Sequence, residues 1–458
     1  MQENKMGYLP IPKLLFNMSG PIALSMLFQS LYNVVDSIFV SRIGEEALAA
    51  VSMAFPIQSL MNAVAIGTGV GMNALLSRSL GQRKFEKANL IGQIGFILTV
   101  ASTFLFILIG LLFSDAFFAT QTNNPLIHEY GVQYTHIITL FSVGIFAQIG
   151  CERLLQSTGR SFESMLTQIA GALINIIFDP ILIFGLGPFP ELGVAGAAYA
   201  TVGGQITAAL MGIFLNLKRN KEINLFQKGF HFNANIVKNV YGIGFPTMVM
   251  IAAGSLTIFI INTILGWFSS TAVVAYGIYF KLQSFVLLPV FGMNNGMVPI
   301  IAYNYGSGHK ERIYEVIKVA LTAAFVFMVA GFLLFQFAPD VLLGFFEPSQ
   351  ELLELGRKCL RICSISFLLA FFPIVVASVL QALGNGVASM IISLIRQLIV
   401  LCPAAYLLSR TGNVNNVWFA LPIAEFTAIT ISFFALRKIL RTHVDHLVPI
   451  EEREKVEQ

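Results

Sequence analysis

Residues 90–114 read LIGQIGFILTVASTFLFILIGLLFS, a run of twenty-five positions without Asp, Glu, Lys or Arg. A helix that crosses a membrane needs about 20 predominantly apolar residues, which this run supplies. A strand of a membrane β-barrel would instead alternate apolar and polar positions over about ten residues. The run therefore predicts a membrane-spanning helix.

The composition of the whole chain resembles that of this run. Of its 458 residues, 56% are hydrophobic and 11% are charged, and the mean hydropathy is +0.76. Soluble globular proteins carry about 25% charged residues. The chain is therefore predicted to be an integral membrane protein, which excludes both a soluble enzyme and a disordered chain. The net charge of +4 is spread over loops, so no nucleic-acid partner is expected.

Similar apolar runs recur along the chain and predict twelve spans, each bounded by charged, Gly or Pro residues. The predicted spans are 15–41, 46–78, 90–114, 127–153, 162–186, 193–217, 238–267, 272–303, 314–338, 352–381, 388–409 and 414–437.

The distribution of Lys and Arg predicts the orientation of these spans. Alternate loops are rich in Lys and Arg, which is typical of the cytoplasmic side, whereas the others are sparse or acidic, as at Glu45 and Glu46. Both termini are therefore expected in the cytoplasm, with the chain in an inner or plasma membrane. Arg357, Lys358 and Arg361 fall on the predicted outer side and depart from this pattern.

An internal repeat relates the two halves of the sequence. An ungapped offset of 225 residues (246 − 21) aligns Pro21 with Pro246. The matched positions also include Gln58-Ser59 with Gln283-Ser284, Gly67 with Gly292, Gly71-Met72 with Gly296-Met297, Gly81 with Gly306, Leu155-Gln156 with Leu380-Gln381 and Gly159 with Gly384. Matching Pro, Gln and Gly over such a distance is improbable for two unrelated apolar helices.

The repeat predicts the fold class: an all-α membrane protein of twelve helices in two pseudo-symmetric six-helix bundles. Because six is even, both halves have the same orientation, as in transporters with parallel repeats. The expected organisation is an N-terminal lobe, 1–217, a cytoplasmic connector, 218–237, and a C-terminal lobe with a cytoplasmic tail, 238–458. Glycines at 67 and 71, and again at 292 and 296, are spaced for close helix approach.

Two acidic residues inside predicted spans are the main candidates for function. An ionisable side chain at the bilayer centre costs about 2.5–3.5 kcal/mol on insertion scales, so it must be paired or functional. Gln29, Asn33 and Asp36 share one face of the first span, and Asn175 and Asp179 share one face of the fifth. Two such carboxylates could exchange a proton or transiently hold Na⁺. Alternatively, each could simply bond to a neighbouring helix.

Three charged residues in the second half, Lys281, Arg396 and Glu425, have two interpretations. A Lys or Arg paired with Glu425 could lock helices together, or these residues could contact substrate or act in gating. Glu152 and Arg153 lie near the cytoplasmic end of the fourth span, where structural or gating roles are favoured.

No resident cofactor or metal is expected from the sequence. The four cysteines lie in or beside apolar runs without His or carboxylate partners, so they are interpreted as buried fillers. They are Cys151, Cys359, Cys363 and Cys402.

The sequence resembles the multidrug and toxic compound extrusion (MATE) transporters, and within them the bacterial MepA- and DinF-like branch. The resemblance covers nearly the whole chain. It rests on the two halves, the Asp36 stripe and three motifs. These are Asn175-Ile-Ile-Phe-Asp-Pro-Ile-Leu-Ile-Phe-Gly185, Leu155-Gln-Ser-Thr-Gly159 with Leu380-Gln-Ala-Leu-Gly384, and Val298-Pro-Ile-Ile-Ala-Tyr-Asn304.

The resemblance implies cation-driven export of amphipathic, often cationic drugs. It also implies a cation site in the first half, formed by Asp36, Asn175, Asp179 and Thr201 with Gln29 and Tyr134 nearby. Another branch of the family carries its coupling carboxylates in the seventh and tenth spans. The corresponding segments here, 251–267 and 367–381, contain no acidic residue. This difference favours coupling through the first half and leaves H⁺ and Na⁺ as alternative coupling ions.

The function predicted from the sequence is a monomeric multidrug antiporter that exchanges amphipathic or cationic drugs for H⁺ or Na⁺ by alternating access. Small drugs and membrane lipid are the expected partners. The alternative is a flippase for lipid or lipid-linked precursors, which the small number of buried Lys and Arg disfavours. An enzyme is not expected, because the sequence shows neither a His/Glu metal cluster nor a Ser/Lys dyad.

Overall fold

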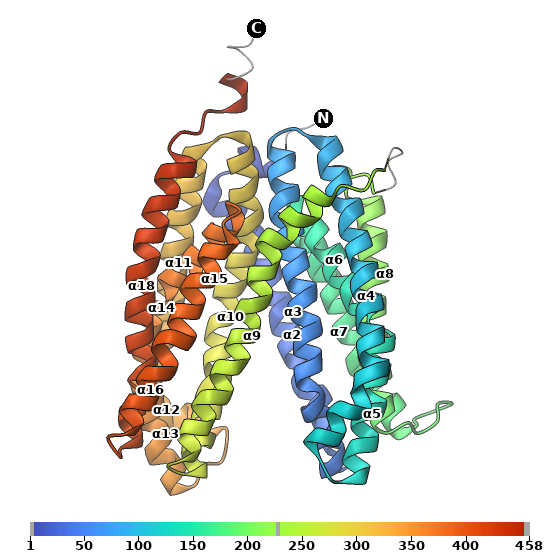
Figure 1. Cartoon of the computed structure of the whole chain (residues 1–458), viewed down its shortest axis with the longest axis vertical. Coiled ribbons are helices and arrows are strands. Elements are labelled where there is room, and N and C mark those ends of the chain that lie inside the picture. The colour runs from blue at the N-terminus through green and yellow to red at the C-terminus, as the bar shows by residue number, and fades with distance from the viewer. Residues whose placement is uncertain (1–3, 226–229, 453–458) are drawn as a thin grey trace. The chain divides into compact units, whose positions relative to one another are not determined.

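The computed structural model describes residues 4–225 and 230–452, and within these ranges all regular secondary structure is helical (Figure 1). The first half contains α1 (Lys5–Tyr8), α2 (Ile11–Ser41), α3 (Glu45–Gly81), α4 (Phe85–Gln121), α5 (Pro125–Leu140), α6 (Val143–Ser157), α7 (Ser161–Phe184) and α8 (Val194–Lys218). The second half contains α9 (Ala234–Gly266), α10 (Ser270–Ser307), α11 (Lys310–Phe337), α12 (Pro339–Gly344), α13 (Gln350–Cys363), η1 (Ser364–Ser366), α14 (Phe367–Ala382), α15 (Gly386–Leu394), η2 (Ile395–Leu401), α16 (Cys402–Ser409), α17 (Val414–Val417), α18 (Ala420–Ile439) and η3 (Leu440–Val444).

The number of long apolar helices agrees with the predicted twelve spans. Among the described residues, eleven helices are long and apolar enough to cross a membrane, and a bent pair, α5 and α6, supplies a twelfth. Several of these helices are continued through short 3₁₀ or π segments, as in Gln350–Ala382. The chain is a multi-pass membrane protein.

The fourth predicted span, 127–153, differs from a straight helix. Its two parts, α5 and α6, meet at an angle of 45° around Phe141 and Ser142. Just after the bend, a Cβ on Gly144 would lie 3.1 Å from the side chain of Gln205 and 3.3 Å from the backbone nitrogen of Ile206. The bend therefore brings α6 onto α8 at a glycine, a tertiary contact that hydropathy does not reveal.

The repeat is reproduced in the hydrogen bonds of two turns. The Gly159 N–H donates to the Gln156 carbonyl at 3.0 Å, and the Arg160 N–H donates to the Leu155 carbonyl at 2.7 Å. The corresponding turn, 225 residues later, has Gly384 bonded to Gln381 at 3.0 Å and Asn385 to Leu380 at 2.8 Å. Gly159 and Gly384 have φ values of 85° and 86°, which a residue with a Cβ rarely adopts.

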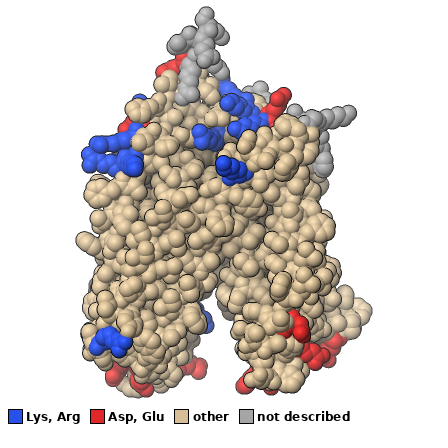
Figure 2. All heavy atoms as spheres, viewed as in Figure 1, with Lys and Arg blue, Asp and Glu red and all other residues tan. Residues whose placement is uncertain are grey.

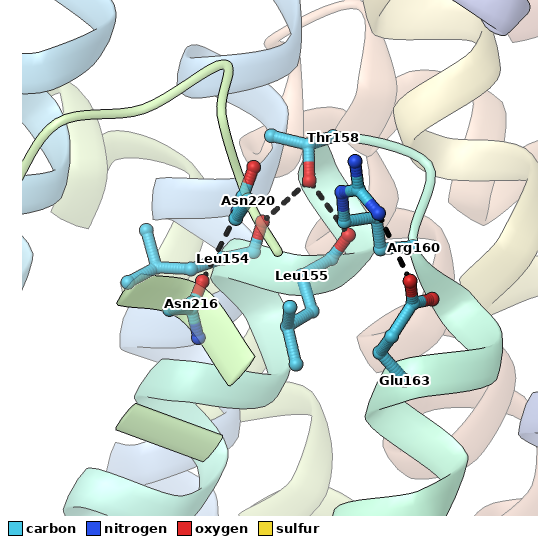
Figure 3. Close-up of polar contacts among 7 residues, drawn as sticks. All are labelled: Leu154, Leu155, Thr158, Arg160, Glu163, Asn216 and Asn220. Carbon is cyan, nitrogen blue, oxygen red and sulfur yellow. Dashed lines mark hydrogen bonds and ion pairs between the residues drawn. The ribbon is translucent and has the colours of Figure 1, made fainter. Parts of the chain in front are cut away.

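Polar side chains surround the first of these turns, and others join the end of α8 to α6 (Figure 3). The Thr158 hydroxyl donates to the Leu155 carbonyl at 3.0 Å, and Arg160 forms an ion pair with Glu163 at 2.9 Å. Just beyond α8, Asn220 donates to Asn216 at 3.1 Å, and Asn216 of α8 donates to the backbone carbonyl of Cys151 on α6 at 3.0 Å. Polar contacts therefore fix this end of the bundle, where helices meet the loops.

The helices form two compact units. Their boundaries differ from the halves of the sequence at the first long helix of each half, α2 and α9. One, called here the N unit, is Leu24–Phe245; the other, the C unit, is Met1–Ala23 with Pro246–Gln458. By packing, the start of α2 belongs to the C unit and the start of α9 to the N unit. The predicted lobes, 1–217 and 238–458, place each of these helices wholly in its own half, and these lobes remain a prediction.

The predicted small-residue faces make the contacts of these helix starts. In the N unit, a Cβ on Gly71 would lie 2.1 Å from the Val240 carbonyl oxygen, and a Cβ on Gly244 would lie 2.4 Å from the Gly67 carbonyl oxygen. In the C unit, the glycines at 292 and 296 lie against Ala23 and Ser19 of α2. Backbones this close leave no room for a side chain, which explains the repeated glycines.

Each unit, taken by itself, has the charge distribution that a membrane bundle needs. On the face shown in Figure 2, the long middle stretch of each unit is almost free of charged side chains, and Lys, Arg, Asp and Glu gather at the ends. The interior is packed with apolar side chains, including Phe106, Phe118 and Phe146 in the N unit. In the C unit, the rings of Phe335 and Phe367 lie 5.2 Å apart.

Candidate coupling site

The site is centred on one face of α7. The Asn175 side-chain nitrogen lies 3.4 Å from the Asp179 carboxylate oxygen Oδ1 and 3.4 Å from the Thr201 hydroxyl of α8. Asp179 is fully buried, and Asn175 is 3% exposed. The predicted i,i+4 relationship therefore places an amide and a carboxylate together in the interior of the N unit, with Thr201 as their neighbour from the next helix.

The amide of Asn175 is better satisfied in the opposite orientation. Its nitrogen then donates to the Asp179 oxygen Oδ2 at 3.3 Å, and its oxygen accepts from the Thr201 backbone N–H at 3.2 Å. In both orientations Asn175 links the carboxylate to α8.

Pro180 adds a further oxygen to this region. It lies inside α7, directly after Asp179. Because proline has no N–H, the helix loses the hydrogen bond from position 180 to the carbonyl of Ile176. A backbone carbonyl without its helical partner is therefore located one turn before the proline, on the helix that carries the carboxylate.

Asp36 of α2 belongs to the same cluster. Its carboxylate interacts electrostatically with that of Asp179 and with the Tyr134 hydroxyl. The Asp36 oxygen Oδ1 is buried and has no hydrogen-bond partner within residues 4–225 and 230–452. The structure thus brings the two predicted carboxylates, from the first and fifth spans, into interaction range of each other.

Two tyrosines complete the polar cluster. Tyr134 is 2% exposed, and its hydroxyl accepts a hydrogen bond from Gln58 of α3 at 2.7 Å. Tyr32 lies between Gln29 and Asp36 on α2, bonds to Gln29 and interacts with both carboxylates. The resemblance predicted Tyr134 and Gln29, whereas Gln58 and Tyr32 were not assigned to the site.

Both overlooked residues had a signal in the sequence. Gln58 is one of the positions that the repeat matches, with Gln283, and Tyr32 falls one turn from Asp36. Asn33, which was predicted to share the polar stripe with Gln29 and Asp36, is exposed, and its backbone carbonyl accepts a hydrogen bond from Ser37.

This arrangement suits a small cation or a proton. Two carboxylates in mutual range repel each other, so binding of a positive charge between them is favourable. The surrounding atoms are amide, hydroxyl and carbonyl oxygens, which are the ligands of hard cations. Asn175, Thr201 and the carbonyl of Ile176 could contribute to such a shell, while Gln58 holds Tyr134 in place.

Glu152 and Arg153 of α6 lie inside the N unit, each beside a glutamine. Gln148 donates to the Glu152 carboxylate at 3.0 Å, and Arg153 donates to Gln156 at 3.0 Å. Gln156 in turn donates to Ser164 of α7 at 3.0 Å. These contacts link α6 to α7, and the structural or gating role of the pair stays a prediction.

The three charged candidates of the second half divide into a pair and a single residue. Arg396 and Glu425 form an ion pair at 3.0 Å. Lys281 of α10 is exposed, and no ion pair joins it to another residue of the described chain. Of the two cations that the sequence offered to Glu425, the structure selects Arg396.

The four cysteines are buried and free, as predicted. The sulfur atoms of Cys359 and Cys363 lie 3.9 Å apart on one face of α13. The sulfur of Cys363 also contacts the backbone carbonyl of Trp418.

Comparison with known proteins gives a consistent assignment. The chain is 28% identical to an FAD transporter of Shewanella oneidensis over 94% of its own length and 95% of the relative's. It is 26% identical to the multidrug export protein MepA of Staphylococcus aureus over 93% of its own length and 94% of the relative's.

Solved structures share the fold. A MATE protein crystallised in complex with MaL6 superimposes with a TM-score of 0.91 at 23% identity, covering 96% of this chain and 99% of that one. The MatE family model matches residues 21–181 and 246–407, and its two copies begin 225 residues apart, at the start of each half. The two matches together span more than half of the sequence, and the chain therefore belongs to the MatE family of transporters.

Proposed function

We propose that this protein is a cation-driven antiporter that exports amphipathic, often cationic compounds from the bacterial cytoplasm in exchange for H⁺ or Na⁺. The observation that carries the proposal is the interaction of Asp36 with Asp179, two carboxylates held inside one membrane-spanning unit. The similarity to MepA, a multidrug export protein, supports the choice of cargo.

The coupling follows from the charge of the pair. An inward-moving H⁺ or Na⁺ neutralises one negative charge at Asp36 and Asp179 and so removes part of their repulsion. Asp36 lies on α2, which contains Pro21 in its interior, and the proline weakens the helix at that turn. We infer that cation loading bends α2 at this turn, and that this change favours the conformation that releases the cargo.

The cation and the cargo need not share a site. Coupling between two ligands requires only that each binds one conformation better than the other. The protein works in this account as a monomer in the plasma membrane, with both termini in the cytoplasm.

Export of a flavin dinucleotide is a second candidate, favoured by the FAD transporter of Shewanella oneidensis. The exposed Lys281 within the α10 span would suit the phosphates of such a cargo. Loading vesicles with FAD in place of a cationic dye distinguishes the two candidates.

Transport by the purified protein in proteoliposomes tests the proposal. Vesicles are loaded with ethidium, and its movement is followed under a pH gradient alone and under a Na⁺ gradient alone. The account predicts gradient-driven dye movement with at least one ion, and the active gradient identifies the coupling ion. Dye movement that is the same with and without either gradient would contradict antiport.

A further inference from the structure

The Arg396–Glu425 ion pair lies deep within its span. Glu425 is eleven residues after the start of α17 at Val414 and twelve before Arg437, which places it about 16 Å and 18 Å along the helix from these points. A pair at this depth cannot reach the membrane surface simply by extending its side chains. Charged residues in such positions are retained for a function or for a strong structural contact.

The repeat gives this pair a counterpart in the N unit. An offset of 225 relates Arg396 to Gly171 and Glu425 to Ala200. Gly171 lies one turn before Asn175, and Ala200 directly precedes Thr201. The charged pair of the C unit is therefore built on the same two helices of the repeat as the polar site of the N unit.

The two units provide different space at these positions. A Cβ on Gly171 would lie only 2.9 Å from the Gly204 carbonyl oxygen, and Ala200 is 1% exposed. In the C unit, Arg396 lies in the π-helical segment η2, which inserts an extra residue into the turn. Such wide turns are frequent at functional sites.

The carboxylate of Glu425 is only half satisfied. Its oxygen Oε1 accepts from Arg396 Nη1, whereas the buried Oε2 has no hydrogen-bond partner in the part of the chain that the structure describes. The Glu425 side chain is 12% exposed and the Arg396 side chain is 25% exposed, so the edge of the pair reaches the surface of the unit. Ile399, one turn from Arg396, is 64% exposed and adds an apolar contact beside it.

We propose that Glu425 is a cargo-binding residue whose free carboxylate oxygen accepts a hydrogen bond from an N–H-bearing ammonium group, with the apolar part of the cargo against Ile399. Arg396 is a positioning residue that holds the other oxygen. The inference rests on the proposed export function. It places the contact with the cationic cargo in the C unit, apart from the coupling-ion site of the N unit. An anionic group is disfavoured here, because Glu425 already neutralises Arg396.

This geometry predicts a preference among cations. A protonated amine can fill the vacant acceptor with a charge-assisted hydrogen bond. Its N-methylated quaternary analogue has the same charge and apolar body but no N–H to donate. Affinity for the amine should therefore depend on Glu425 more strongly than affinity for the quaternary compound.

Binding of such a matched pair to the full-length protein in lipid nanodiscs tests this. We expect Glu425→Gln to weaken binding of the amine by about tenfold or more and that of the quaternary compound by less than about threefold. The double variant Arg396→Gln/Glu425→Gln carries no unpaired charge and should give the same loss of preference. Glu163→Gln, which breaks the Arg160–Glu163 pair at a helix end, serves as the matched control and should change neither affinity.

The outcomes separate this inference from the proposed function. If the wild-type protein binds both cations but Glu425→Gln and the double variant weaken both equally or neither, the inference is wrong and the export function stands. If the wild-type protein binds neither cation, the proposed cationic cargo is wrong as well.

Repeating the binding measurement in nanodiscs of different lipids identifies the source of the ammonium group. If the headgroup of phosphatidylethanolamine fills the acceptor, replacing phosphatidylcholine with it lowers amine affinity in the wild type and not in Glu425→Gln.

Discussion

In its better-satisfied orientation, the Asn175 amide donates to the carboxylate of Asp179, one helical turn further along α7, at 3.3 Å, and it accepts from the Thr201 backbone N–H on α8 at 3.2 Å. Asn175 therefore connects the buried carboxylate to the neighbouring helix. A change in the charge of Asp179 should alter the strength of this hydrogen bond. Cation binding should therefore affect the packing of α7 and α8 together.

Removing this contact should weaken coupling. We expect Asn175→Ala to lower gradient-driven dye efflux by about tenfold, since a hydrogen bond to a charged group contributes about 1.5–3 kcal/mol. The measurement is the initial rate in proteoliposomes at matched protein content. Thr207→Ala is the control, because the hydroxyl of Thr207 donates to the Gly203 carbonyl of its own helix, α8. Equal rates for Asn175→Ala and the control would exclude this role.

Tyr134 and Gln58 make a second prediction. Tyr134→Phe removes the acceptor of the Gln58 side chain and a hydroxyl that interacts with Asp36. We expect a fall in cation-driven efflux of about three- to tenfold with little loss of stability. Tyr199→Phe, at a ring that is 41% exposed, should transport like the wild type. A normal rate for Tyr134→Phe would place its hydroxyl outside the mechanism.

Site residues that are close in the sequence could be predicted to lie together, whereas those that are far apart in the sequence could not. Asn175 and Asp179 share a helix face, so helical periodicity alone was enough to place them together. The approach of Asp36 to Asp179 depends on how two helices pack, and it came from the family resemblance. Gln58 was noticed only as a repeated position, because nothing local indicates that its partner lies 76 residues away.

The close contact of α3 with the start of α9 predicts a steric effect. A Cβ added at Gly71 would lie 2.1 Å from the Val240 carbonyl oxygen, so Gly71→Ala must push the helices apart. Overpacking of this kind costs about 1–3 kcal/mol, and the melting temperature in detergent should fall by several degrees. Gly242→Ala, on α9 at a position where no atom of the described residues beyond its own helix turn lies within 4 Å of the added carbon, should not lower the melting temperature. Equal melting temperatures for the two variants would contradict this packing.

The turn at Gly384 predicts a purely conformational effect. Its φ is 86°, and apart from Gly384 and its two chain neighbours no atom of the described residues lies within 4 Å of an added Cβ. Gly384→Ala should therefore destabilise the protein by about 1–2 kcal/mol through backbone strain alone. Gly384→Asn should lose less, because Asn tolerates this conformation better. Thermal unfolding of both variants measures the difference, and an Ala variant as stable as the wild type would contradict the strain.

Much of the fold follows from sequence periodicity. The packing of the start of α2 in the C unit and of the start of α9 in the N unit does not. The apolar runs predicted the spans, because hydropathy is a local pattern, and the offset of 225 residues matched the positions that form the two turns. The packing of Ala23 against Gly292 joins residues 269 positions apart, and hydropathy is the same wherever a helix packs. Likewise, the choice of Arg396 over Lys281 as the partner of Glu425 depends on tertiary position.

The central claim is that Asp36 and Asp179 couple cation entry to export. The most direct measurement compares the wild type, Asp36→Asn and Asp179→Asn in proteoliposomes under the active ion gradient, with ethidium efflux as the signal and thermal unfolding as the check on folding. Asparagine keeps the size of the side chain and removes its charge. The account predicts that each folded variant still binds the dye but loses at least nine-tenths of gradient-driven efflux, about a tenfold change. Full gradient-driven efflux by either folded variant would contradict the carboxylate mechanism.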